Sequence, residues 1–342
     1  MVELGWGILG VTCGVCLVYQ VRAVAVACLT PQKADPPRSP GGTSDGLTDG
    51  SADARPLVQA AFAAVAILNK FDKVTDFAGG TNFAVVALLT FFLGGHTGSI
   101  RAVVATAAVC VWSARLAVFL LCRILLWGED KRFDEMRSKP AVFAGFWAIQ
   151  FLWVWVVTLA VALLNEGVGG DPGRAVGGVD FAGWALFSVG LVVETVADFQ
   201  KLFFKQNADN AGRWCAVGLW KWSRHPNYFG EMLFWLGVYL ACVEGLGWRA
   251  AVVGFLSPAF IFALLMFLSG MPLLEASAHK KHGAKPEYRH YLEGTSILVP
   301  LPNALYRALP RAVKTYVLLD LDLYRKGLVD GADGGSYEAP AL

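Results

Sequence analysis

The sequence predicts an all-α protein, a polytopic transmembrane helical bundle of about eight spans. Two features of composition predict this fold. The first is the residue content, since 56% of the 342 residues are hydrophobic and only 16% are charged, and the second is the mean hydropathy of +0.50. A soluble domain carries about 25% charged residues. The third feature is the recurrence of apolar stretches near the roughly 20 residues that a helix needs to cross a bilayer.

The first apolar stretch is long and lacks the basic start of a cleaved signal peptide, so we expect it to remain as a span. The second and third stretches are short, which leaves tilted, re-entrant or merged arrangements open, with about seven or ten spans as alternatives. In chain order, the stretches cover residues 5–29, 57–68, 82–95, 100–127, 140–164, 178–197, 228–244 and 248–273.

The distribution of Lys and Arg predicts the orientation, because cytoplasmic loops retain positive charge. Residues 201–221 and the C-terminal segment are basic and are expected to face the cytoplasm, as is the N-terminus. Residues 31–56 are expected on the lumenal or outer side, as a flexible loop rich in Pro, Gly, Ser and Asp. A multi-pass protein of the endoplasmic reticulum membrane is expected if the source is eukaryotic.

Two classes of partner are not expected. The formal net charge of +2 is too small to indicate nucleic acid. Seven cysteines lie almost entirely in apolar segments, and the Cys13-x-x-Cys16 spacing stands in a span without a second pair or a nearby histidine. Helix packing explains these cysteines better than ligation, so no metal site is predicted.

The most informative stretch is Ser223–Glu231, SRHPNYFGE, which places a guanidinium, an imidazole, an amide, a phenol and a carboxylate beside strongly apolar sequence. Pro226 suits the first turn of a helix, where its missing N–H costs nothing. Arg224, His225 and Asn227 then lie at a helix N-terminus, which favours a phosphate. The sequence therefore predicts an anionic cofactor at this position.

Two helical faces flank this stretch. Glu194, Asp198, Lys201 and Lys205 are spaced by four, three and four residues, so they share one face of a helix that leaves the membrane. A solvated stripe is the alternative, but a carboxylate at the apolar end of a span is costly unless it is paired or lines a wet cavity.

On the helix after Pro226, four residues, Tyr228, Glu231, Trp235 and Tyr239, also share one face. An aromatic stripe in a membrane helix usually serves packing or an interfacial belt. Glu231 is the exception because an ionisable group inside a span needs a partner. A ribose hydroxyl, a carboxamide or Arg224 would each serve.

These motifs carry a family resemblance. VETVADFQKLFFK, GLWKWSRHPNYFGEMLFWLG, LSGMPLLEASAHKKHG and PEYRHYLEGTSILVPLP resemble the C-terminal catalytic half of the steroid 5α-reductase superfamily, closest to its steroid 5α-reductase-like branch. The resemblance covers roughly residues 70–302. The chain then divides into an N-terminal region 1–69 (a span, the flexible loop and a short second span), a catalytic membrane domain 70–302 and a cytoplasmic tail 303–342.

The resemblance implies an enzyme that uses NADPH to reduce a carbon–carbon double bond in a sterol, steroid or related lipid. Asn227 and Glu231 match family residues that contact the cofactor, Asp198 and Lys205 match the preceding cofactor-binding helix, and Tyr291 matches the tyrosine before the terminal proline. Glu194 stands where the steroid enzymes carry Asn. The expected cofactor-binding residues are Glu194, Asp198, Lys201, Lys205, Trp220, Arg224, His225, Asn227, Glu231 and Tyr291, and the expected catalytic residues are Tyr228, Glu231 and Tyr239.

A second resemblance offers an alternative. Arg-His-Pro-x-Tyr-x-Gly also resembles isoprenylcysteine carboxyl methyltransferases and phospholipid methyltransferases, which use S-adenosylmethionine. The cationic cluster favours NADPH, because a sulfonium cofactor has no phosphates to neutralise. A non-enzymatic sterol-binding membrane protein is the third alternative.

Overall fold

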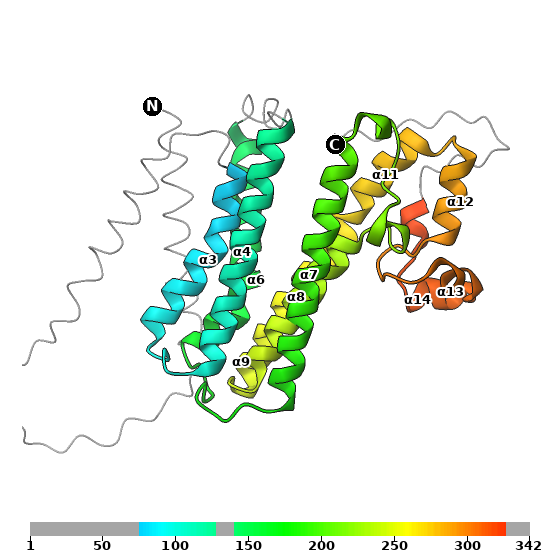
Figure 1. The fold of residues 1–342 in the computed structure, drawn as a ribbon. Helices are drawn as coiled ribbons and strands as arrows, with labels where there is room; N and C mark the ends of the chain where they lie inside the picture. Colours follow the sequence, from blue (N-terminus) through cyan, green and yellow to red (C-terminus); the bar gives the residue numbers. More distant parts are fainter. Residues whose placement is uncertain (1–74, 128–139, 326–342) are drawn as a thin grey trace, which may run out of the picture. The chain divides into compact units, whose positions relative to one another are not determined.

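The structure, a computed structural model, describes residues 75–127 and 140–325 (Figure 1). The regular secondary structure of these residues is helical, and the one isolated β-bridge among them joins Ser223 to Ser296. The prediction of an all-α fold is confirmed for them. The expected spans at 5–29 and 57–68, the loop 31–56 and the Cys13/Cys16 pair lie outside the described residues.

The longer helices follow the predicted apolar stretches, and shorter ones complete the C-terminal region. The helices are α3 (Thr75–Gly94), α4 (Ile100–Trp127), α6 (Pro140–Asn165), α7 (Gly178–Gln206), α8 (Pro226–Val243), α9 (Trp248–Gly254), α10 (Leu256–Ala263), α11 (Met271–His282), α12 (Pro286–Gly294), α13 (Asn303–Ala308) and α14 (Arg311–Tyr316). A π-helical turn, Leu264–Leu268, follows α10.

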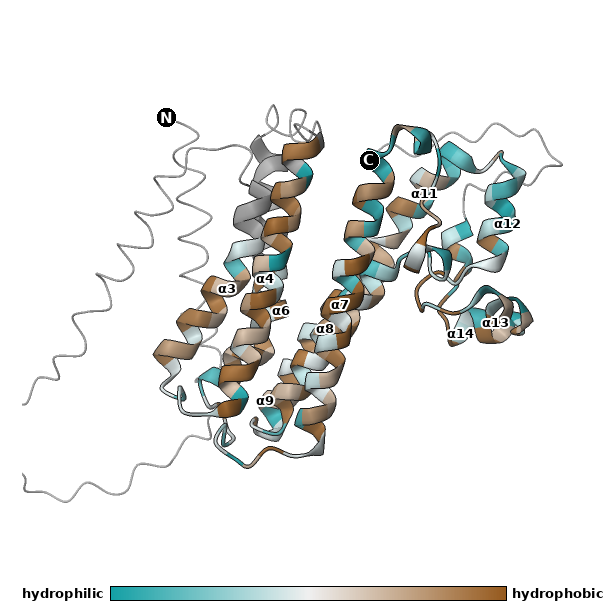
Figure 2. Cartoon of the chain, viewed as in Figure 1, coloured by the Kyte–Doolittle hydropathy of each residue, from teal (hydrophilic) through white to brown (hydrophobic). Residues whose placement is uncertain are grey.

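Three helical segments of the described chain are long and apolar enough to cross a membrane: Ile100–Arg123, Gly178–Gln206 and Trp248–His282. Two more, Gly80–Gly94 and Leu152–Asn165, are apolar but shorter. Figure 2 shows apolar residues along α3 and α4 and mainly polar residues along α12. A membrane protein is therefore compatible with the described helices.

The described chain forms two compact units. The first unit contains the chain up to Ser188 together with Trp235–Phe260, and the second contains Val189–Phe234 together with the chain from Ile261 onward. Both α7 and α8 contribute residues to each unit.

An aromatic core holds α3, α4 and α6 together in the first unit, where the three helices run side by side (Figure 1). The ring of Phe83 meets the rings of Trp112 and Trp153 edge to face at centroid distances of 5.1 and 4.9 Å. Such contacts stabilise beyond their buried area by about 0.5–1.5 kcal/mol. At one end of the unit, Arg101 Nε donates to Asp180 Oδ1 at 2.6 Å, and both side chains are fully buried.

Glycines bring α7 and α8 into close contact in each unit. In the second unit, a Cβ on Gly230 would lie 2.5 Å from the backbone nitrogen of Glu194 and 2.7 Å from the carbonyl oxygen of Gly190. In the first unit, a Cβ on Gly237 would lie 2.3 Å from the backbone nitrogen of Phe187. Only a residue without a side chain fits these approaches.

The core of the second unit joins segments far apart in sequence. Met266 and Met271 pack with Ile297, Leu298 and Tyr324, and all five are at most 4% exposed. The Tyr324 hydroxyl also donates to the carbonyl oxygen of Met266 at 2.7 Å. The described part of the expected tail, residues 303–325, thus contributes to this core.

Candidate functional site

The SRHPNYFGE stretch is held in place by backbone pairing with the segment before Pro300. The backbone N–H groups of Arg224 and His225 donate to the carbonyls of Ser296 and Ile297 at 2.8 and 3.1 Å. The Ser223 hydroxyl donates to the Leu298 carbonyl at 2.7 Å. The helix α8 then begins at Pro226, as the sequence predicts.

Arg224 is 6% exposed and is bound by two carboxylates. Its Nη1 donates to Glu275 Oε2 at 2.5 Å, and its Nη2 donates to Asp320 Oδ1 at 3.1 Å. Burial disfavours the guanidinium charge, but the two carboxylates outweigh it and raise the pKa of Arg224. The terminal nitrogens that sequence reasoning assigned to a phosphate are therefore engaged within the protein.

His225 lies beside this ion pair, 4% exposed. Its Nε2 lies 2.7 Å from Glu275 Oε1, and its ring stacks on the Tyr228 ring at a centroid distance of 5.5 Å and an interplanar angle of 8°. Burial lowers the pKa of His225, although the bond to Glu275 opposes the shift. A neutral imidazole that donates from Nε2 presents Nδ1 as an acceptor, and this atom is buried without a partner among the described residues.

Three more buried polar atoms near the start of α8 lack a hydrogen-bond partner among the described residues: Arg224 Nε, Asn227 Oδ1 and Ser296 Oγ. Buried polar groups are usually paired, so this concentration distinguishes the N-terminus of α8 from the rest of the unit. The atoms include donors and acceptors, which suits a polar ligand such as a ribose or a carboxamide.

The face of α7 that carries Glu194 contacts α8 in the second unit. Glu194 is 4% exposed and packs against Gly230. The carboxylates of Asp198 and Glu231 lie near enough to Tyr228 to act on it electrostatically. The Tyr228 hydroxyl itself makes no hydrogen bond with another described residue.

Trp220 ties the motif to α7. Its indole N–H donates to the carbonyl of Ala197 at 2.8 Å, and Lys201 Nζ lies 4.2 Å from the centroid of its ring. The Tyr291 hydroxyl donates to the backbone carbonyl of Trp220 at 2.8 Å. Burial raises the pKa of Tyr291, so this phenol stays protonated. Lys205, one turn after Lys201, is exposed.

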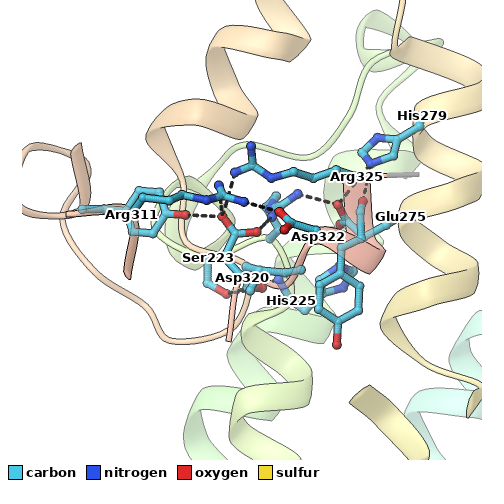
Figure 3. Close-up of polar contacts among 12 residues, drawn as sticks. Ser223, His225, Glu275, His279, Arg311, Asp320, Asp322 and Arg325 are labelled. Atoms are coloured by element: carbon cyan, nitrogen blue, oxygen red, sulfur yellow. Dashed lines mark hydrogen bonds and ion pairs between the residues drawn. The ribbon is translucent and has the colours of Figure 1, made fainter. Parts of the chain in front are cut away.

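The structure thus gathers all but one of the expected site residues in the second unit. Tyr239 belongs to the first unit, where its hydroxyl donates to the Ala251 carbonyl at 3.2 Å. The sequence did not predict that Glu275 and Asp320 are the partners of Arg224 (Figure 3 labels both carboxylates). Glu275 stands four residues before His279 on one helix, a spacing in the sequence that indicates a polar contact. No such spacing marks Asp320.

The sequence model of the family described as "Protein of unknown function (DUF1295)" matches residues 62–295. "Uncharacterized protein C594.04c" of Schizosaccharomyces pombe is 29% identical over 177 residues, 44% of this chain and 51% of that protein. "Probable O-methyltransferase ustE" of Ustilaginoidea virens is 39% identical over 59 residues, 17% of this chain and 21% of that protein. The chain thus spans about half, or less, of the length of these curated relatives. No solved structure matches it.

Proposed function

The chain belongs to the DUF1295 family, and we propose that it is a membrane-embedded reductase that uses NADPH to reduce a carbon–carbon double bond in a sterol, steroid or related lipid. The resemblance of its motifs to the steroid 5α-reductase superfamily supports this activity. The three long apolar helices support a membrane location, and we extend the count to about eight spans, in the endoplasmic reticulum if the source is eukaryotic.

The observation that carries the proposal is the position of the Tyr228 hydroxyl. It has no hydrogen-bond partner among the described residues, and its ring stacks on His225. Reduction of a double bond conjugated to a carbonyl develops negative charge on the carbonyl oxygen. A free phenol hydroxyl donates to that oxygen and stabilises the charge.

The residues at the start of α8 fit the polar groups of NADPH. Asn227 Oδ1 and Ser296 Oγ, both buried and unpaired among the described residues, would hold a ribose or the carboxamide. Because Arg224 is engaged by two carboxylates, the phosphates are assigned to Lys201 and Lys205 on α7. When bound, NADPH supplies the hydride, and Tyr228 holds the proton at the acceptor oxygen.

A methyltransferase that uses S-adenosylmethionine is the second candidate. The likeness to the probable O-methyltransferase of Ustilaginoidea virens favours it. The internal pairing of Arg224 also favours it, because fewer cations remain for phosphates. The Tyr228 hydroxyl, which has no hydrogen-bond partner among the described residues, favours the reductase. A reductase needs a proton donor, whereas methyl transfer to an anionic acceptor needs no acid.

Cofactor binding to the detergent-solubilised full chain tests the proposal. NADPH should raise the melting temperature, with a smaller rise for NADH and none for S-adenosylmethionine, since a ligand that binds the native state stabilises it. Lys201→Gln and Lys205→Gln should reduce the NADPH effect. A rise with S-adenosylmethionine and none with NADPH would establish the second candidate instead.

A further inference from the structure

Asp320 is a fully buried carboxylate in a segment that the family match does not reach, since that match ends at residue 295. Its Oδ1 accepts a hydrogen bond from Arg224 Nη2 at 3.1 Å. Its Oδ2 accepts from the Tyr306 hydroxyl at 2.7 Å and from Arg325 Nη2 at 3.2 Å. A buried carboxylate with three donors is held in one orientation.

The backbone beside Asp320 is strained. Leu319 has φ +59°, a left-handed conformation that a residue with a branched side chain adopts rarely. The strain persists because its surroundings hold the turn: the Asp320 N–H donates to the carbonyl of Lys314 at 2.9 Å, and Leu319 and Leu321 pack against the core that contains Tyr324. The turn directs the Asp320 carboxylate toward Arg224 (Figure 3 labels Asp320 and Arg325).

A continuous chain of contacts leads from Asp320 to His225. Arg224 uses one terminal nitrogen for Asp320 and the other for Glu275. Glu275 in turn uses Oε2 for Arg224 and Oε1 for His225 Nε2. The orientation of the guanidinium thus depends on both carboxylates, and the orientation of Glu275 depends on the guanidinium.

We propose that Asp320 is a positioning residue of the site at the start of α8, acting through Arg224 and Glu275 on the imidazole of His225. The bond at Nε2 decides which nitrogen of His225 carries the proton and how the ring lies against Tyr228. The C-terminal segment 303–325 therefore completes the site. The catalytic meaning of this placement rests on the proposed function, whereas the placement itself does not.

Nitrogen NMR of the histidine-labelled full chain in detergent tests the proposal without cofactor or substrate. The His225 signals are identified by their loss in His225→Gln. Asp320→Asn removes the charge and keeps the shape, and it should shift both nitrogen signals of His225. Tyr306→Phe is the matched control: it removes a different bond to Asp320, leaves the bond to Arg224, and should leave the His225 signals unchanged.

Unchanged His225 signals in folded Asp320→Asn, with only a lowered melting temperature, would overturn the proposal and make Asp320 a purely structural residue. If Asp320→Asn does not fold, Arg224→Lys tests the same chain, because lysine keeps the charge but lacks the planar fork that reaches two carboxylates. Shifted His225 signals in Arg224→Lys support the chain, and unchanged signals refute it.

Cofactor binding separates this proposal from the proposed function. If the parent protein does not bind NADPH, the reductase is refuted while the NMR comparison still gives its answer. If the parent reduces a lipid enone, Asp320→Asn should lose kcat and keep its KM for NADPH, and Asp320→Glu should recover part of kcat. A raised KM for NADPH with an unchanged kcat would contradict positioning through His225.

Discussion

The carboxylate of Asp320 accepts a hydrogen bond from Arg224 at 3.1 Å across 96 residues of sequence. With Glu275 on the other side, the Arg224 guanidinium lies between two buried carboxylates. Removing one partner of a buried ion pair leaves a charge without compensation, which costs more than the pair itself contributes. We therefore expect loss of Arg224 to affect the stability of the second unit more than it affects ligand binding.

Arg224→Ala should lower the free energy of unfolding by about 3–5 kcal/mol, because it leaves Glu275 and Asp320 buried without their cation. Denaturant titration in mixed micelles, followed by the fluorescence of the tryptophans, measures this loss. The triple variant Arg224→Met, Glu275→Gln, Asp320→Asn should regain part of it. If Arg224→Ala were as stable as the parent, the ion pairs of Arg224 would contribute nothing to the free energy of unfolding.

The course of the chain near the site was predictable where local rules decide it. Pro226 begins α8, and the stretch 100–127 forms one helix, because a proline in the first turn and a long apolar run are local signals. The partners of Arg224 were not predictable. Glu275 and Asp320 follow it by 51 and 96 residues, and no periodicity connects positions on different helices and a loop.

The apolar stretch 248–273 shows a different limit. Its composition predicts one span, and the helical segment Trp248–His282 is long and apolar enough to be one, but composition does not predict the π-helical turn Leu264–Leu268 within it. The residues of that turn are as apolar as their neighbours, so hydropathy gives no sign of it. The glycine contacts between α7 and α8 were visible in principle, since Gly183 and Gly190, like Gly230 and Gly237, stand seven residues apart.

Gly230→Ala should destabilise the protein by about 1–3 kcal/mol, because the new methyl group meets the backbone of Glu194 and Gly190. Gly178→Ala is the matched control, since no atom lies within 4 Å of its added Cβ. A helical alanine in open space should be neutral or stabilising by up to about 1 kcal/mol. Equal thermal stability of the two variants would mean that α7 and α8 do not approach closely at Gly230.

Tyr228→Phe should reduce NADPH-dependent turnover of a lipid enone by at least about 100-fold, because it removes the proton donor and nothing else. NADPH affinity and melting temperature should stay near those of the parent, since the hydroxyl makes no hydrogen bond to another described residue. Tyr316→Phe, at a side chain that is 80% exposed, controls for the loss of a phenol. Undiminished turnover in Tyr228→Phe would assign the donor elsewhere.

The stability of the parent should fall faster below pH 6.5 than that of His225→Gln. Burial lowers the pKa of His225 in the folded state, while the unfolded chain keeps a value of about 6.5. Above that pH both states are neutral, and the full stability is present. As the pH falls below 6.5, His225 binds a proton in the unfolded chain but not in the folded protein. The free energy of unfolding therefore falls by at most about 1.4 kcal/mol for each pH unit.

Glu275 contacts the imidazole, and the charges of Arg224 and Lys201 act on it. Glutamine is the suitable replacement because it keeps a donor for Glu275. Melting temperatures of both proteins between pH 7.5 and pH 5 measure the difference, in which the contributions of the other histidines cancel. Parallel curves would mean that His225 accepts a proton as readily in the folded protein as in the unfolded chain. Such curves would show either that the imidazole is open to water or that the bond to Glu275 fully offsets the cost of burying its charge.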